Sequence, residues 1–223
     1  MIEYLAPWWP LIASGLLNTV LLAAAIAVLS TILAIAVSLG LVSTRRWLAV
    51  SCRAYVEIFR SVPALVLLML MYFGLGEIVG ALGISAFWVA VIALSVNQSA
   101  YTAESYRAAI ESVSRTQWDA ARAIGLSRSQ AYRLVVLPQA VTPAIAPSAN
   151  ALVMIVKDSA LASIITVPEL VLAANRIIQT TFQVIPTYVA IGVVYLLLTV
   201  PLIYVGRYFE QRVARRRATA VQA

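Results

Sequence analysis

The sequence contains no histidine and a single cysteine, Cys52, and only 11% of its 223 residues are charged. Without histidine there is no imidazole general base and no imidazole metal ligand. One cysteine can form neither a disulfide within the chain nor a thiolate metal cluster. Soluble domains carry roughly 25% charged residues, so this chain cannot cover itself with polar surface in water. The composition therefore predicts one integral membrane domain over residues 1–223.

Apolar sequence makes up 62% of the chain. A helical membrane span needs about 20 apolar residues, and five runs approach this length. They cover residues 11–43, 54–73, 86–106, 138–156 and 186–206. The glycine-rich stretch 74–85 is expected to form a loop or short turn. Pro168 and Glu169 are typical of a helix start, so a short helix is predicted over about residues 168–180.

The basic residues predict the orientation of these spans. The chain has 16 lysines and arginines. Its arginines gather between the first and second spans, between the third and fourth, and after the fifth, and only Arg176 falls on the other side. Basic loops remain in the cytoplasm. We therefore expect the N-terminus outside, the C-terminus inside and residues 107–137 in the cytoplasm.

Residues 107–137 form a long polar segment in an otherwise apolar chain. The stretch up to Ile124 is expected to form two helical turns, and Gly125 can end them in the left-handed conformation. Ser127 and Gln130 then have the spacing of a capping box at the start of a second helix. Such a knob suits either a docking site for a partner or an amphipathic helix on the lipid headgroups, and the pattern alone favours neither.

Two groups of polar residues stand within or beside the spans. Lys157 and Asp158 follow the fourth span, where they complement the carboxylate and ammonium groups of an amino acid. The alternative is an interfacial pair whose side chains reach water. Asn97 and Gln98 in the third span must be hydrogen-bonded, and they can serve either a substrate or a neighbouring helix.

Two acid–base pairs have a spacing of three residues near the cytoplasmic side, Glu104 with Arg107 and Glu57 with Arg60. Exposed pairs of this kind contribute little to stability. A plain surface pair is therefore the favoured interpretation, and a part in a cytoplasmic gate is the alternative.

Five motifs in chain order resemble the polar-amino-acid branch of the ATP-binding-cassette (ABC) importer permeases. The family's cytoplasmic EAA loop has an acid, two alanines, a glycine four positions on and a distant Leu-Pro. That pattern falls here on Asp119, Ala120, Ala121, Gly125, Leu137 and Pro138. The five motifs lie at residues 59–66, 100–104, 137–140, where the loop pattern ends, 157–161 and 169–170. The resemblance covers about residues 15–201.

The chain also departs from the family pattern. Asp119 replaces the usual glutamate, which keeps the charge on a shorter side chain. Thr116 stands where the family has glycine, and Ser61 and Val62 replace Gly-Thr. None of these changes removes a group that the pattern depends on.

The resemblance implies an all-α integral membrane protein with the type I ABC importer permease fold. It implies five transmembrane helices, an outside N-terminus and a cytoplasmic C-terminus in the bacterial inner membrane. In the family the loop docks on a cytoplasmic ATPase, a role that falls here on Asp119, Ala120, Ala121 and Gly125. The substrate path is expected to include Asn97, Gln98, Lys157, Asp158 and Ser159.

The resemblance further implies a multi-subunit transporter. The expected partners are a cytoplasmic ABC ATPase dimer, a second permease subunit that is identical or paralogous, an extracytoplasmic solute-binding protein and membrane lipid, with no nucleic acid. The one lysine, Lys157, follows Val156, so the chain has no phosphate-binding Gly-Lys-Ser/Thr loop. ATP and Mg²⁺ are therefore expected on the ATPase, with no cofactor and no catalysis in this chain.

The alternative to an importer subunit is a self-contained secondary transporter or channel driven by an ion gradient. Such transporters are commonly built from paired repeats, which this sequence lacks. An importer would carry polar amino acids or close derivatives. Because few acids are available to pair with a cationic side chain, we expect neutral, acidic or zwitterionic cargo.

Overall fold

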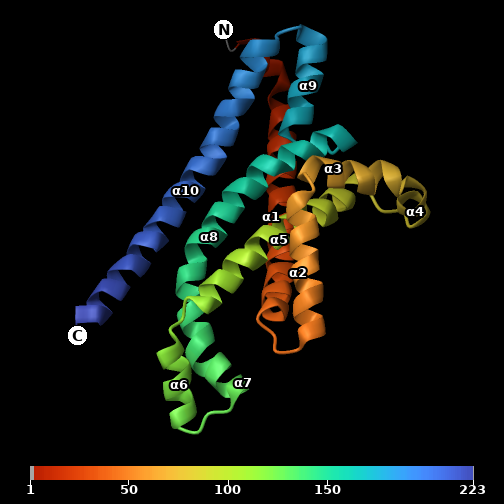
Figure 1. Cartoon of the computed structure of the whole chain (residues 1–223). Coiled ribbons are helices and arrows are strands. Elements are labelled where there is room, and N and C mark those ends of the chain that lie inside the picture. The colour runs from red at the N-terminus through yellow and green to blue at the C-terminus, as the bar shows by residue number, and fades with distance from the viewer. Residues whose placement is uncertain (1–2, 223) are drawn as a thin grey trace.

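The computed structural model describes the backbone of residues 3–222 and the side chains of residues 4–211, and this part of the chain contains helices but no strand (Figure 1). The all-α prediction is confirmed. The side chains of the C-terminal arginines at 212, 215, 216 and 217 lie outside the described residues.

Two long helices form the centre of the molecule. After a 3-10 turn, η1 (Glu3–Trp8), α1 (Trp9–Leu41) packs along α5 (Ala86–Glu111). Leu22 and Ile26 of α1 are buried at this contact with the α5 alanines Ala90 and Ala93. Small side chains let two helix backbones approach closely, which explains why so much of the contact surface is alanine.

The second apolar run folds as a right-angled elbow. α2 (Arg46–Ser61) and α3 (Ala64–Met69) meet at 99°, and α3 continues as a π-helical turn, η2 (Leu70–Gly74). Pro63 restricts the residue before it, and Val62 accordingly has extended backbone angles of φ −88° and ψ 124°. The span expected over residues 54–73 is therefore broken at its centre. The glycine-rich stretch that follows includes a short helix, α4 (Gly76–Ala81).

Helices α8 (Leu137–Asp158) and α10 (Val184–Gln222) flank the central pair, and a 3-10 segment, η4 (Ser159–Ile165), follows α8. The short helix expected near residue 168 exists as α9 (Leu170–Thr181). Its N-cap, Glu169, is buried and accepts hydrogen bonds from the backbone amides of Val171 and Leu172, both at 2.8 Å. An anion at this end of a helix is favoured by the helix dipole.

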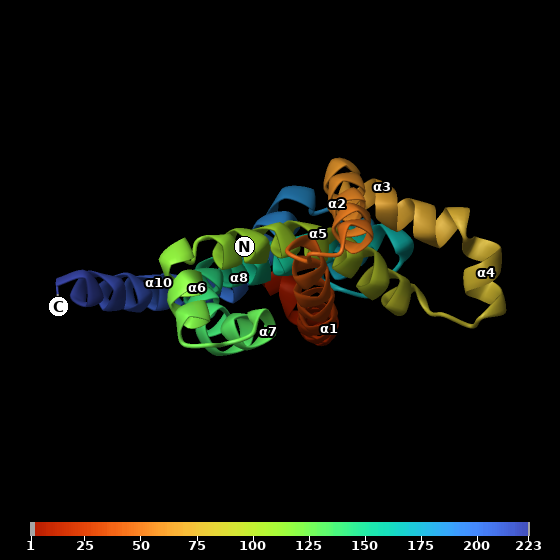
Figure 2. The same ribbon diagram turned by 60° about the horizontal axis from the view of Figure 1, so that its bottom comes forward.

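The polar segment projects from one end of the bundle. It contains α6 (Arg115–Ala123), α7 (Arg128–Ala131) and a π-helical turn, η3 (Tyr132–Val136), that leads into α8. Figure 1 shows α6 and α7 at the opposite end of the molecule from the N-terminus and α9. In Figure 2, α3 and α4 extend away from the bundle on one side, and the end of α10 extends on the other.

Length and composition identify three helical segments within the described residues that can cross a membrane. They are Tyr4–Leu41, Arg128–Ile165 and Val184–Gln211. The elbow pair adds a fourth if it is taken as one broken span. The expected third span, in α5, is not among them, because Asn97, Gln98 and the charged residues after Ala103 reduce its apolar character. A multi-pass membrane protein follows from these helices.

Candidate functional site

The projecting segment has the helix–turn–helix geometry that its sequence predicts. Gly125 ends α6 with a φ of +83°, a region that residues with a Cβ rarely adopt. Ser127 and Gln130 then form both bonds of a capping box, from Gln130 N to Ser127 Oγ at 3.4 Å and from Ser127 N to Gln130 Oε1 at 2.9 Å. These local bonds make the turn between α6 and α7 stiff.

We call residues 115–136 the coupling segment. Its base packs on the helix bundle. The rings of Trp118 and Tyr132 lie 6.2 Å apart. Both rings pack against a small core that includes Val136, the last residue of η3, and Ala140 of α8. Val42, just after α1, packs against the same core. The segment therefore packs beside the end of α1 and the start of α8.

The coupling segment exposes two large apolar side chains among its polar residues. Ile124 is 77% exposed and Leu134 is 65% exposed. Asp119 and Ala120 are also exposed, whereas Ala121 is buried against the base of the segment. Exposed apolar side chains beside polar ones are typical of a protein interaction site.

A cavity of about 500 Å³ lies between α5 and α8, at the start of α3. This volume falls within the ~300–1,000 Å³ of small-molecule sites. Its wall is richer in polar side chains than the two apolar hollows that α1 lines, one with the start of α10 and one with α8. It is lined by Ala64, Asn97, Gln98, Tyr101, Thr102, Ser105, Pro147, Asn150, Ala151, Met154 and Asp158.

The structure brings together three of the residues expected in a substrate path. Asn97, Gln98 and Asp158 all line the cavity, and the Asp158 carboxylate accepts no hydrogen bond from a described residue. Lys157 and Ser159 do not line it. The lysine is exposed, and the serine is buried with its hydroxyl donated to Val156 O at 2.8 Å. The Lys157–Asp158 pair is therefore split, because neighbouring residues of a helix point about 100° apart.

Asn97 also serves the elbow. Its amide nitrogen donates to the carbonyl oxygens of Phe59 at 2.8 Å and Val62 at 3.1 Å. One helical turn further along α5, the Tyr101 hydroxyl donates to the carbonyl oxygen of Arg60 at 2.9 Å. α5 thereby satisfies carbonyl groups that the break in the helix leaves without intrahelical partners.

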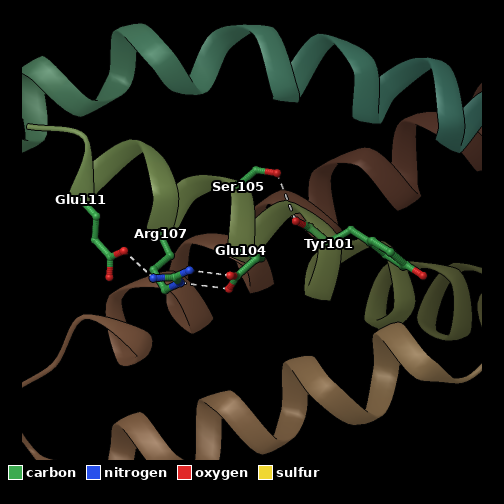
Figure 3. A network of polar contacts seen from close by, with 5 residues as sticks. All are labelled: Tyr101, Glu104, Ser105, Arg107 and Glu111. Atoms are coloured by element: carbon green, nitrogen blue, oxygen red, sulfur yellow. Dashed lines mark hydrogen bonds and ion pairs between the residues drawn. The ribbon is translucent and has the colours of Figure 1, made fainter.

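An ion-pair network lies near the C-terminal end of α5 (Figure 3). Arg107 donates to both carboxylate oxygens of Glu104, at 2.6 and 3.0 Å, and also pairs with Glu111. Hydrogen bonds to Glu104, and then to Glu111, raise the pKa of Arg107 above its ordinary value. Arg60 lies over the Tyr101 ring at 5.3 Å, and no ion pair joins it to Glu57 in the described residues.

A second hollow is unsuitable for polar cargo. An apolar groove of about 780 Å³ lies between the start of α1 and α10. It is lined by residues such as Trp9, Ile12, Val189 and Val193 and offers almost no hydrogen-bonding groups. Of these two hollows, the α5–α8 cavity is therefore the one that offers hydrogen-bonding partners to a polar solute.

Sequence reasoning missed Tyr101, Asn150 and the exposed Ile124. A signal for the first two exists, because Tyr101 lies four residues after Asn97, and Asn150 lies eight residues before Asp158. These spacings place polar side chains on one face of each helix. No local pattern distinguishes Ile124, because its exposure depends on how α6 packs.

Comparisons with known proteins agree with this geometry. The family described as binding-protein-dependent transport system inner membrane component matches residues 27–215. The chain is 36% identical over 187 residues to the probable amino-acid ABC transporter permease protein YckA of Bacillus subtilis, covering 84% of this chain and 82% of that one. It is 32% identical over 212 residues to the arginine transport system permease protein ArtQ of the same species, covering 92% and 94% respectively.

Solved structures are similar over nearly the whole chain. An amino acid ABC transporter crystallised with histidines is 30% identical, with a TM-score of 0.88, and the match covers 95% of this chain and 98% of that one. An inward-facing MetNI methionine ABC transporter has a TM-score of 0.80 over 93% of this chain and 98% of its own, at 21% identity. The second likeness shows the fold alone.

These findings confirm the resemblance to importer permeases and decide against the gradient-driven alternative. Subunits of this family do not catalyse ATP hydrolysis, which takes place on a separate ATPase, and they work with a substrate-binding protein. The chain belongs to the family of binding-protein-dependent transport system inner membrane components, as the permease subunit of an ATP-driven importer.

Proposed function

We propose that this chain forms the translocation path for polar amino acids or close derivatives across a bacterial inner membrane. The cavity between α5 and α8 carries the proposal, because amide and hydroxyl groups surround one carboxylate, Asp158, that no described residue pairs. Relatives of the chain are described as permeases for glutamine, arginine, nopaline and octopine. All of these solutes carry an amino or imino nitrogen and a carboxylate.

The transporter would contain two permease subunits, identical or paralogous, with two ATPases in the cytoplasm and a solute-binding protein outside. ATP and Mg²⁺ would be held by the ATPases, and no cofactor is proposed for this chain. α5 and the elbow pair would count as spans, which gives five, with the N-terminus outside and the C-terminus inside. The cationic loops between and after the spans support this orientation.

The coupling segment would dock on the ATPase. The exposed Asp119, Ala120 and Ile124 would contact it, while Gly125 sets the turn that presents them. Ala121 would act through packing, since its side chain points into the base. ATP-driven approach of the ATPases would move this stiff segment and, through Val42 and Val136, both α1 and α8.

The cargo proposed is neutral, acidic or zwitterionic rather than cationic. Asp158 is the one acid that lines the cavity, and it is sufficient for a single ammonium group. Gln98, Asn150 and Ser105 are neutral donors and acceptors suited to a polar side chain or a carboxylate. A second cationic group on the cargo would remain without a charged partner.

Co-purification tests this function directly. The tagged permease is purified from its native membranes in mild detergent, and Mg²⁺-dependent ATPase activity is measured with and without the solute-binding protein loaded with amino acids. We expect a stoichiometric ATPase subunit whose activity rises with the loaded binding protein. A pure, folded permease that brings no ATPase subunit with it would contradict the proposal.

A further inference from the structure

The right-angled elbow is held by side chains of α5 that belong to the cavity wall. Asn97 is 7% exposed and donates both hydrogens of its amide, to Phe59 O and Val62 O. An amide nitrogen has two hydrogens, so its donor capacity is used entirely by the elbow. Two carbonyl acceptors also fix which end of the side chain is the nitrogen.

The other end of the same amide is left for the cavity. Asn97 Oδ1 accepts no hydrogen bond from a described residue. In the described part of the chain, the Tyr132 hydroxyl is the one fully buried polar side-chain atom without a partner. Asn97 Oδ1 is therefore not fully buried. Asn97 and Asp158 line the cavity together, and they also meet in a narrow recess beside Ile155. Gln98 also lines this recess, so its wall has three side chains that can accept a hydrogen bond and no cation.

We propose that Asn97 links the elbow to the cargo. Its nitrogen holds the α2–α3 break, and its oxygen forms, with the Asp158 carboxylate, the acceptor pair for the ammonium group of the cargo. The inference rests on the proposed function for the identity of the cargo. The Asn97 amide is planar, so its nitrogen and its oxygen turn together. Releasing the elbow carbonyls from the nitrogen therefore turns the oxygen away from Asp158 and weakens binding of the cargo's ammonium group.

Tyr101 acts in this arrangement as a positioning residue. Its hydroxyl holds Arg60 O, the carbonyl that lies between the two held by Asn97, and the guanidinium of Arg60 covers its ring. Loss of that hydroxyl loosens the elbow and leaves both acceptors of the ammonium site in place. The structure offers a matched control in Tyr55 of α2, whose hydroxyl bonds to Val96 O of α5 at 3.1 Å and to Ser99 Oγ at 2.7 Å. This hydroxyl holds no carbonyl of the elbow, and Tyr55 does not line the cavity.

The test uses the complete transporter with its ATPases, in lipid nanodiscs and in a Cys52→Ser background. Spin labels are attached at Arg53→Cys on α2 and at Leu70→Cys beyond α3. The electron–electron distance between them reports the angle between the two arms of the elbow. Equilibrium binding of a ¹⁴C-labelled mixture of the twenty proteinogenic amino acids reports the cargo site. The variants compared are Tyr101→Phe, Asn97→Asp and the control Tyr55→Phe.

We expect a narrow distance distribution in the wild type and in Tyr55→Phe, with binding that agrees within about twofold. Tyr101→Phe should broaden the distribution and weaken binding about 3- to 10-fold, as the loss of one hydrogen bond predicts. Asn97→Asp keeps the size and an acceptor but loses both donors and gains a negative charge that the elbow carbonyls repel, so it should broaden the distribution further. Because that added charge also acts on an ammonium group directly, Asn97→Asp is compared by the distance distribution and not by binding.

Three results would overturn the inference. Asn97→Asp with a narrow distribution would show that the amide does not hold the elbow. A loosened elbow in Tyr101→Phe with unchanged binding would show that elbow and cargo are independent. Equal losses in Tyr55→Phe and Tyr101→Phe would assign the effect to general α2–α5 packing. A wild-type transporter that neither binds nor takes up any labelled amino acid would instead refute the proposed function. The spin-label distances would then still test whether Asn97 and Tyr101 hold the elbow.

Discussion

Gly125 shows how one residue can control an interface that it does not fill. At its φ of +83° a side chain would be strained, although a Cβ there would meet no atom within 4 Å. The constraint on this position is therefore in the backbone and not in packing. This positive φ strains every residue other than glycine, and asparagine tolerates it best.

We expect Gly125→Val to uncouple the transporter while the protein stays folded and inserted. The strain of about 1–3 kcal/mol at this conformation disfavours the turn that presents Asp119 and Ala120. A bias of that size corresponds to roughly a 5- to 150-fold change in population. Uptake should fall accordingly when it is measured in cells with matched amounts of permease in the membrane.

The control is Gly76→Val in α4, where a Cβ also meets open space but φ is not positive. That variant should keep uptake near the wild-type rate. Normal uptake by Gly125→Val would argue against a docking role for the α6–α7 turn.

At the scale of elements, α9 is held by a buried cluster that connects three helices. Glu169 caps α9 and accepts a hydrogen bond from the Tyr195 hydroxyl of α10 at 2.9 Å. Thr19 of α1 accepts one from Leu170 N at 3.2 Å, and Asn18 donates one to Pro168 O at 2.9 Å. These bonds join the start of α9 to both α1 and α10.

Glu169→Ala should lower the stability of the permease by about 1–3 kcal/mol, because it leaves two half-buried amides and one hydroxyl without an acceptor. Tyr195→Phe removes one bond and should cost less, about 0.5–1.5 kcal/mol. Thermal unfolding of the purified permease in detergent measures both. Equal stability of Glu169→Ala and the wild type would show that water or lipid groups replace the carboxylate.

The elements also show where sequence patterns succeed and where they do not. The α6–α7 turn, the capping box and the start of α9 follow from residues within four positions of one another, and each was predicted. The elbow was not, although Pro63 stood in the sequence. A proline can kink, end or simply begin a helix, and the direction of the break depends on carbonyl partners that lie on α5.

At the scale of the whole molecule, the arrangement predicts which surfaces face each compartment. The coupling segment and the α9–α10 turn lie at opposite ends of the bundle (Figure 1). Ser129 in the first and Gln183 in the second are both exposed. If the cationic loops are cytoplasmic, these two positions lie on opposite sides of the membrane.

Single cysteines test this orientation in a Cys52→Ser background. A membrane-impermeant maleimide should label Gln183→Cys in cells whose inner membrane is intact, because that turn faces outward. Ser129→Cys should react only after the inner membrane is permeabilised. Labelling of Ser129→Cys in intact cells would reverse the orientation and place the coupling segment out of reach of a cytoplasmic ATPase.

The sequence by itself determined the class of the protein. Composition, apolar runs and five motifs identified a helical membrane permease, and short-range rules located the coupling turn, because backbone conformation there depends on adjacent residues. Only the tertiary structure decided which polar residues share a cavity. Lys157 and Asp158 are neighbours in the chain but face different surroundings, while Asp158 meets Asn97 from another helix. The rotation of each helix about its axis is set by packing along its whole length, and no local pattern contains that information.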